Sequence, residues 1–215
     1  MAVLAYCITE ADARIGVPPE GLQGKKIGDV AESGLRCFFS SYSSDNAASR
    51  QPARDAALGF NRILQTFLRQ TAIVPFRFPT LLADVDEASA FLREHAGEYL
   101  DGLSRVRGAV QMEVRLSTPG SSEHAVKNSG AEYLRARQAH YQRVFGIADE
   151  LHKAVGGSAK SHKTRQVAEG ARCFFLVDRG AVDQFVSNVQ SAKLPAEVNV
   201  RVSGPWPATE FLKES

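Results

Sequence analysis

The order of strand-like and helix-like segments after residue 108 is the feature that most restricts how this chain can fold. Six segments are assigned from the spacing of their apolar residues, which is two in strands and about 3.6 in helices. In chain order they are 108–116, 127–155, 159–167, 170–177, 181–190 and 196–203. The resulting order, strand, helix, strand, strand, helix, strand, predicts a ferredoxin-like (βαββαβ) sandwich with helices on one face of an antiparallel sheet.

The first half of the chain predicts a second, less regular α+β unit. Its strands and helices alternate in a different order, with a loop expected over 16–28. The expected elements are strands at 2–8 and 35–39, a helix at 52–70, an extended segment at 72–78 and a helix at 85–103. Pro75 cannot donate a ladder hydrogen bond, so the extended segment is expected at a sheet edge or bulge. The fold class is therefore α+β, with domains at 1–107 and 108–215.

One short string occurs in both halves. Residues 30–39 read Val-Ala-Glu-Ser-Gly-Leu-Arg-Cys-Phe-Phe, and residues 167–175 read Val-Ala-Glu-Gly-Ala-Arg-Cys-Phe-Phe. Either a duplicated or mimicked half-domain or the chance recurrence of a strand-like string explains this similarity.

Charge and cysteine content exclude several classes of partner. The chain has 215 residues, with 26 lysines and arginines against 24 aspartates and glutamates, so its net charge is only +2. This balance gives no electrostatic reason to expect a nucleic-acid or membrane partner. Cys7, Cys37 and Cys173 each lie in an apolar run, where a reduced thiol behaves as a small hydrophobe. We expect a cytoplasmic protein with neither a signal peptide nor a spanning helix, since no apolar run approaches about 18 residues.

No catalytic or cofactor-binding motif is present in the sequence. It contains no Gly-x-Ser-x-Gly elbow, no P-loop and no dinucleotide-binding fingerprint. The histidines do not form a metal-ligating set with cysteines or carboxylates. Asp84, Asp86 and Glu87 are expected to stabilise a helix N-terminus. We therefore expect no enzyme activity, no cofactor, no metal and no small-molecule substrate.

Two aromatic positions have both a structural and a binding interpretation. Trp206 lies between two prolines after Gly204, so a rigid turn is expected there. Its indole either closes the core of the 108–215 domain or anchors a partner. Arg77, between Phe76 and Phe78, either stacks on these rings or pairs with a carboxylate.

Several stretches resemble the gas vesicle protein F/L family in the expected order. The segment 73–80 (Ile-Val-Pro-Phe-Arg-Phe-Pro-Thr) follows a helix containing 60–64, and 108–116 is similar to the family's central strand. The Ser-Gly-x-x-Tyr-Leu start of a long helix is found in 129–135. A Gly-Pro-Trp-Pro close before an aromatic residue is found in 202–211. The last two motifs are the most specific, and the resemblance does not separate the F branch from the L branch.

This resemblance implies a cytoplasmic, gas vesicle-associated accessory or minor structural protein that acts by binding. Its implied partners are the hydrophobic shell protein and other gas vesicle accessory proteins. Shell subunits expose apolar surface and free strand edges before assembly, and a binding partner can cover them. The candidate contact residues, which the sequence does not rank, are Pro75, Arg77, Arg135, Arg137, Arg143 and Trp206.

Two alternatives remain open at the level of sequence. A ferredoxin-like scaffold also hosts small-molecule enzymes and sensors, which need a pocket with convergent polar groups. A homologue that oligomerises through its sheet edges and serves another protein shell is the other alternative.

Overall fold

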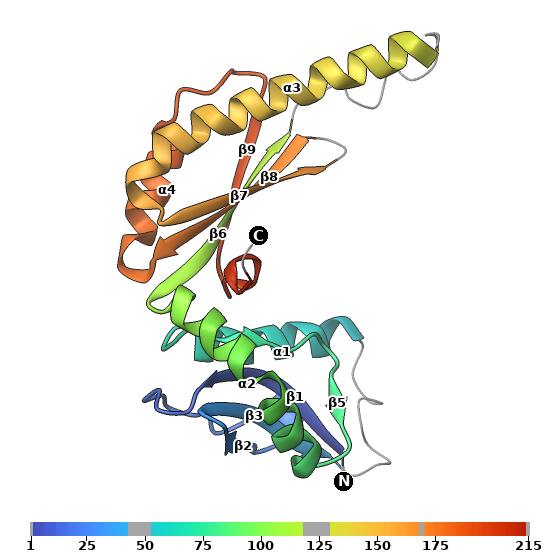
Figure 1. Cartoon of the computed structure of the whole chain (residues 1–215), viewed down its shortest axis with the longest axis vertical. Helices are drawn as coiled ribbons and strands as arrows, with labels where there is room; N and C mark the ends of the chain where they lie inside the picture. Colours follow the sequence, from blue (N-terminus) through green and yellow to red (C-terminus); the bar gives the residue numbers. More distant parts are fainter. Residues whose placement is uncertain (1, 43–52, 118–129, 168–169, 214–215) are drawn as a thin grey trace. The chain divides into compact units, whose positions relative to one another are not determined.

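A computed structural model describes residues 2–42, 53–117, 130–167 and 170–213 (Figure 1). The chain divides into two compact units. The first contains Met1–Gly108 together with Trp206–Ser215, and the second contains Ala109–Pro205. The change of unit near residue 108 lies where the sequence places it. The last ten residues, which the sequence assigns to the second domain, group with the first unit instead.

The first unit consists of two helices and a sheet whose strands differ in length. Its strand order is β2-β3-β1-β4, and β5 also pairs with β1. The elements are β1 (Ala2–Glu10), β2 (Ile27–Glu32), β3 (Leu35–Tyr42), α1 (Ala53–Leu68), β4 (Val74–Pro75), β5 (Leu81–Leu82) and α2 (Val85–Val106). The Asp84 side chain accepts a hydrogen bond from the Glu87 backbone N–H at 2.9 Å, so the expected helix start at these carboxylates is confirmed.

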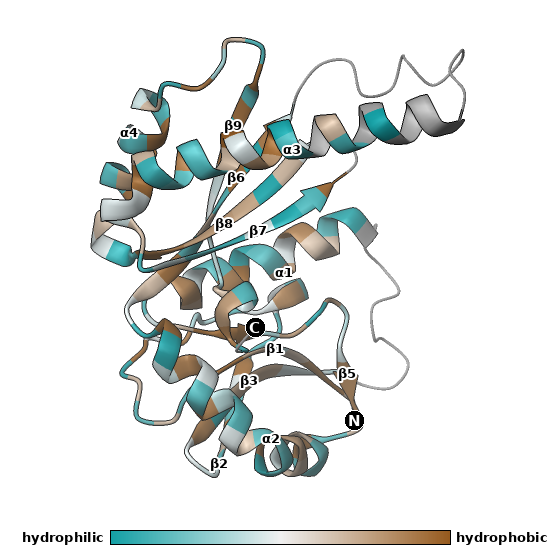
Figure 2. Ribbon diagram, turned by 45° about the horizontal axis from the view of Figure 1, so that its top comes forward, coloured by the Kyte–Doolittle hydropathy of each residue, from teal (hydrophilic) through white to brown (hydrophobic). Residues whose placement is uncertain are grey.

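The central strand β1 is covered on both faces. The Tyr6 ring packs 5.4 Å from Phe60 on α1, measured between ring centroids. Side chains alternate along a strand, so Ala5, next to Tyr6, points to the opposite face, and it is fully buried. The helix α2 packs against β1, β2 and β3. This two-sided burial explains why residues 2–8 read as a continuous apolar run, and why β1 and β3 are brown in Figure 2.

The second unit has the element order expected from the sequence. Its strands form a four-stranded sheet in the order β7-β8-β6-β9. The elements are β6 (Ala109–Ser117), α3 (Gly130–Val155), β7 (Ser161–Val167), β8 (Gly170–Asp178), α4 (Val182–Ser191) and β9 (Asn199–Trp206). The strand β8 pairs antiparallel with both β6 and β7.

The two helices of the second unit cover one face of its sheet. Val114 and Phe175 from the sheet form a buried cluster with Leu151 of α3 and Phe185 of α4. The intervening residues of β6, β7 and β8 lie on the other face, named here the helix-free face. It carries Glu113, Arg115, Lys163, Arg165, Arg172 and Phe174.

Exposure on the helix-free face is uneven. Arg115 is exposed, as the alternation in 108–116 predicts, but Gln111 is only 6% exposed. The pattern therefore identifies the two faces without revealing how completely each one is covered.

The repeated string marks equivalent hairpins. Residues 30–32 and 35–39 lie on β2 and β3, and Val167 and residues 170–175 lie on β7 and β8. Each hairpin supplies the first two strands in the order of its sheet, β2-β3-β1-β4 in one unit and β7-β8-β6-β9 in the other. The sequence analysis missed β2 because Gly28 and Asp29 are typical of loops. In the structure, pairing with β3 over its whole length stabilises this strand.

The turn expected at residues 204–207 is wrong in its position, because β9 continues to Trp206. Gly204 has φ +129°, and a Cβ there would lie 2.8 Å from the sulfur of Met112 on β6. This close approach requires glycine. Pro205 is accommodated because β9 is an edge strand.

Candidate partner-binding site

The segment between β4 and β5 follows the edge of the first sheet. Pro75 pairs with Cys7, and the Phe76 N–H donates to the Tyr6 carbonyl at 2.9 Å. Further along, the Ala5 N–H donates to the Thr80 carbonyl at 3.0 Å. The edge position expected for Pro75 is confirmed, since β4 ends the strand order. Arg77 is exposed in this segment, and its carbonyl accepts a hydrogen bond from the Thr80 hydroxyl at 2.6 Å.

A row of rings, named here the aromatic strip, begins beside this edge and continues along α2. Phe76 lies 5.5 Å from Phe91, Phe91 lies 4.3 Å from His95, and His95 lies 5.6 Å from Tyr99, between ring centroids. All four side chains are only partly buried. The four-residue spacing of the three helical members places them on one face of α2. The strip and the neighbouring edge combine partly exposed apolar area with a sheet margin, which suits binding of another polypeptide.

A buried hydrogen-bond network supports this edge from inside. The Tyr6 hydroxyl donates to Ser40 Oγ at 3.0 Å and accepts from the Leu22 N–H at 2.9 Å. Ser40 Oγ donates to the Lys26 carbonyl at 3.0 Å, and the Tyr42 hydroxyl donates to the Leu22 carbonyl at 2.8 Å. Burial raises the pKa of Tyr42 well above its ordinary value, so this phenol stays protonated. The network uses its polar atoms internally, which is typical of a structural role.

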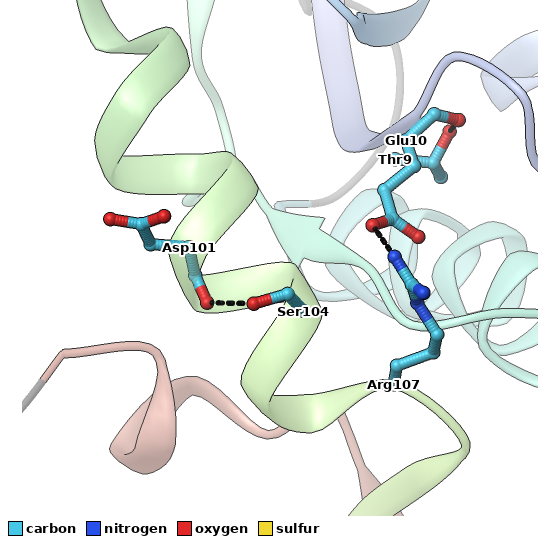
Figure 3. Close-up of polar contacts among 5 residues, drawn as sticks. All are labelled: Thr9, Glu10, Asp101, Ser104 and Arg107. Carbon is cyan, nitrogen blue, oxygen red and sulfur yellow. Dashed lines mark hydrogen bonds and ion pairs between the residues drawn. The ribbon is translucent and has the colours of Figure 1, made fainter.

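The C-terminal end of α2 is held by polar contacts within the first unit. The Arg107 guanidinium pairs with the Glu10 carboxylate at the end of β1, at 2.5 Å, and the Ser104 hydroxyl donates to the Asp101 carbonyl at 2.8 Å (Figure 3). Arg105 donates to the Leu212 carbonyl at 2.7 Å. A Cβ on Gly102 would lie 2.9 Å from that same carbonyl oxygen. The residues after Trp206 therefore pack closely against α2.

Trp206 is partly buried at the end of β9 and groups with the first unit. The expectation that its indole closes the core of the C-terminal domain stays a prediction. Its use as a partner anchor stays a prediction.

The arginines expected on the long helix belong to the second unit. Arg135 is exposed on α3, and so is Arg143, which forms an ion pair with Glu197. Arg137 also belongs to α3, but its side chain lies outside the described part of the structure. The six candidate residues are thus distributed over both units, with Pro75, Arg77 and Trp206 in the first and the three arginines of α3 in the second.

The thiols are unsuited to nucleophilic chemistry. All three cysteines are free and buried. Burial raises the pKa of Cys37 to about 12 and that of Cys173 to about 11, and it raises the pKa of Cys7 strongly. At neutral pH these groups stay protonated, and a thiol is a poor nucleophile.

One side-chain pair was missed by the sequence analysis. His152 on α3 and His162 on β7 lie in ring contact, and His152 Nε2 is 3.3 Å from the Thr164 hydroxyl. Ten residues separate the two histidines, and only the packing of α3 on the sheet brings them together. Within the described ranges, no group of three or more histidine, cysteine or acidic side chains is placed to hold a metal ion.

Over residues 2–42, 53–117, 130–167 and 170–213, no helix combines the length and apolar character needed to span a bilayer. No curated protein sequence matches the chain.

Solved structures of similar fold come from gas vesicle proteins. The crystal structure of gas vesicle protein GvpF from Microcystis aeruginosa superposes with a TM-score of 0.78 at 11% identity, covering 99% of both chains. The crystal structure of gas vesicle protein GvpF from Anabaena sp. PCC7120 superposes with a TM-score of 0.78 at 14% identity, covering 100% of this chain and 97% of the other. At such identities the likeness establishes the fold. The model of the family described as gas vesicle synthesis protein GvpL/GvpF matches residues 2–213, so the chain belongs to the GvpL/GvpF family.

Proposed function

We propose that this protein assists gas vesicle formation by binding the hydrophobic shell protein or other gas vesicle proteins through the first unit. Membership of the GvpL/GvpF family supports a role in gas vesicle assembly. The observation that carries the finer proposal is the aromatic strip beside the β4–β5 edge. It presents rings from Phe76 to Tyr99 next to the margin of a sheet.

The physical argument rests on complementarity with an unassembled shell subunit. Such a subunit exposes apolar area and unpaired strand edges, and both promote aggregation. The partly exposed rings of Phe91 and Tyr99 supply contact area at low entropic cost. The adjacent edge at Pro75 and Arg77 supplies backbone groups for strand addition. A partner covered in this way stays competent for assembly.

A binding mode of action fits the described chemistry better than catalysis. The thiols are buried and protonated, and a groove of about 680 Å³ lies between α4 and β9 in the second unit. The residues lining that groove include Met112 and Leu194 but no histidine, cysteine, aspartate or glutamate. Acid–base or nucleophilic chemistry needs such groups. We place the protein in the cytoplasm in association with gas vesicles. Its recovery with floated, salt-washed vesicles tests that location.

Pull-down with purified shell protein tests the binding surface. The variants Phe91→Ala and Tyr99→Ala remove rings of the aromatic strip, and we expect each to weaken capture by about tenfold, as for aromatic hot spots. Phe145→Ala is the matched control, because Phe145 is 42% exposed on α3 of the second unit. Equal capture by the wild type and both strip variants, or an equal loss with Phe145→Ala, contradicts the proposed surface.

A further inference from the structure

Three arginines form one cross-strand row on the helix-free face of the second sheet. Arg172 on β8 stands directly opposite Arg115 on β6 and directly opposite Arg165 on β7. Neighbouring strands lie about 4.8 Å apart, so the Cα atoms of the outer two arginines are about 10 Å apart. Like charges placed directly opposite each other destabilise a sheet. The row concentrates positive charge on this face.

One carboxylate on this face neutralises the middle arginine. Arg172 donates from Nε and Nη2 to the two oxygens of Glu113, at 2.7 Å and 2.9 Å. This two-pronged hydrogen bond holds the pKa of Glu113 below its ordinary value, so the pair is charged at neutral pH. Arg115 and Arg165 flank the pair and are both exposed.

The remaining side chains add to the positive charge. Lys163 lies on the same face, two residues before Arg165 on β7, opposite Phe174. Among the described residues of β6, β7 and β8, the face thus carries four basic side chains and two carboxylates, Glu113 and Asp178 at the end of β8, which pairs with Lys160. The strand β7 is drawn mostly in the hydrophilic colour in Figure 2. Such an excess of positive charge favours an anionic partner.

The ring on this face is not available to a ligand. The guanidinium carbons of Arg165 and Arg172 lie 5.5 Å and 5.1 Å from the centroid of Phe174, which is only 2% exposed. Single-stranded nucleic acids bind through bases stacked on accessible rings. A covered Phe174 therefore disfavours a nucleic acid. The Arg172–Glu113 pair shows instead the two-pronged carboxylate geometry that arginine forms well.

We propose that the helix-free face of the second sheet docks an acidic segment of a protein partner, whose carboxylates bind Arg115 and Arg165. The segment lies across β8, with two carboxylates separated by about 10 Å, the separation of these arginines across two strand spacings. This surface belongs to the second unit and is independent of the aromatic strip of the first. Its partner is recognised by charge, whereas the strip recognises apolar surface.

Binding of a fluorescently labelled decaglutamate peptide, followed by anisotropy at low ionic strength, tests this inference. We expect the wild type to bind the peptide and added salt to weaken the binding. The double variant Arg115→Gln/Arg165→Gln loses two charge-assisted contacts, so its affinity falls at least about tenfold. The variant Arg115→Lys/Arg165→Lys keeps the charge without the guanidinium fork, and its affinity should fall between the two.

The matched control is Arg69→Gln, which removes one exposed arginine from the turn directly after α1 of the first unit. It should leave the affinity for decaglutamate unchanged. Both substituted arginines are exposed, so we expect the variants to fold. Thermal melting checks this. The inference is overturned by absence of decaglutamate binding, by equal binding to the glutamine double variant, or by an equal loss with Arg69→Gln. Tighter binding of a ten-nucleotide oligothymidylate through the same arginines also overturns it, because the face would then serve a nucleic acid.

Discussion

The imidazole rings of His152 on α3 and His162 on β7 lie 3.8 Å apart between their centroids. Burial first, and then His162, lower the pKa of His152, while Asp149 acts in the opposite direction. The charged form of His152 is therefore disfavoured in the folded state. Above the unfolded pKa of about 6.5, His152 is neutral in both states and the protein keeps its full stability. As the pH falls below that value, the unfolded state takes up the proton more readily than the folded state, so the free energy of unfolding decreases.

We predict that the free energy of unfolding decreases from pH 7.5 to pH 5 partly because of this pair. In the variant His162→Gln the decrease should be smaller, because the neighbouring imidazole is gone while the burial of His152 remains. Urea denaturation at both pH values measures the difference. His95→Gln, which changes a histidine stacked between Phe91 and Tyr99, serves as the control and should keep the wild-type pH dependence. An unchanged pH dependence in His162→Gln contradicts the prediction.

The substitution Gly204→Ala is expected to destabilise the protein by about 2–3 kcal/mol, through a strained φ and a close contact. The added methyl would lie 2.8 Å from the Met112 sulfur and 3.0 Å from the Gln111 carbonyl oxygen. Gly146→Ala is the matched control on α3, where a methyl group meets nothing within 4 Å. It should stabilise the protein by about 0.5–1 kcal/mol, as expected for alanine in a helix. Chemical denaturation of both variants checks the opposite signs, and equal effects would count against the close approach.

Removing the Tyr6 hydroxyl should cost about 1–3 kcal/mol of stability, because Tyr6→Phe leaves the Leu22 N–H buried without its acceptor. The loss should be cooperative with Ser40→Ala, since Tyr6 also donates to Ser40 Oγ. A double-mutant cycle on urea midpoints measures this coupling. Tyr99→Phe, at a partly exposed ring, is expected to change stability by less than about 0.5 kcal/mol. Strictly additive losses for Tyr6 and Ser40 would rule out the network.

The thiols should resist alkylation in the folded protein. Burial raises the pKa of Cys173 to about 11, so little thiolate exists at pH 8. Incubation with iodoacetamide followed by mass spectrometry should show an unmodified native chain. The same reaction in guanidinium chloride should modify all three cysteines of the sequence. Rapid modification of the native protein would show that a cysteine lies in an accessible site.

Local periodicity predicted most of the elements, because long amphipathic helices and buried strands leave strong patterns. The stripe in 52–70 became α1, and the apolar run at 2–8 became β1. The strand β2 was missed because its stability comes from pairing with β3 rather than from its own residues. The strand β9 was ended too early, because the need for glycine at position 204 arises from Met112, distant in sequence.

The candidate sites were less predictable because they depend on register and packing. The spacing of Phe91, His95 and Tyr99 shows that they share a helical face, but not that this face stays partly exposed. The row formed by Arg115 and Arg172 depends on which residues stand opposite each other across two strands. No local pattern contains that information.

The chain leaves the first unit after Gly108 and returns to it at Trp206, so the second unit is an insertion within the first. Cutting the chain at residue 107 or 108 would therefore separate α2 from the Leu212 carbonyl that accepts from Arg105. To isolate the first unit, residues 109–205 should be replaced by a short glycine-serine linker. The second unit, by contrast, consists of residues 109–205, which are one continuous stretch of the chain. Dissection of the protein into fragments has to respect this nesting.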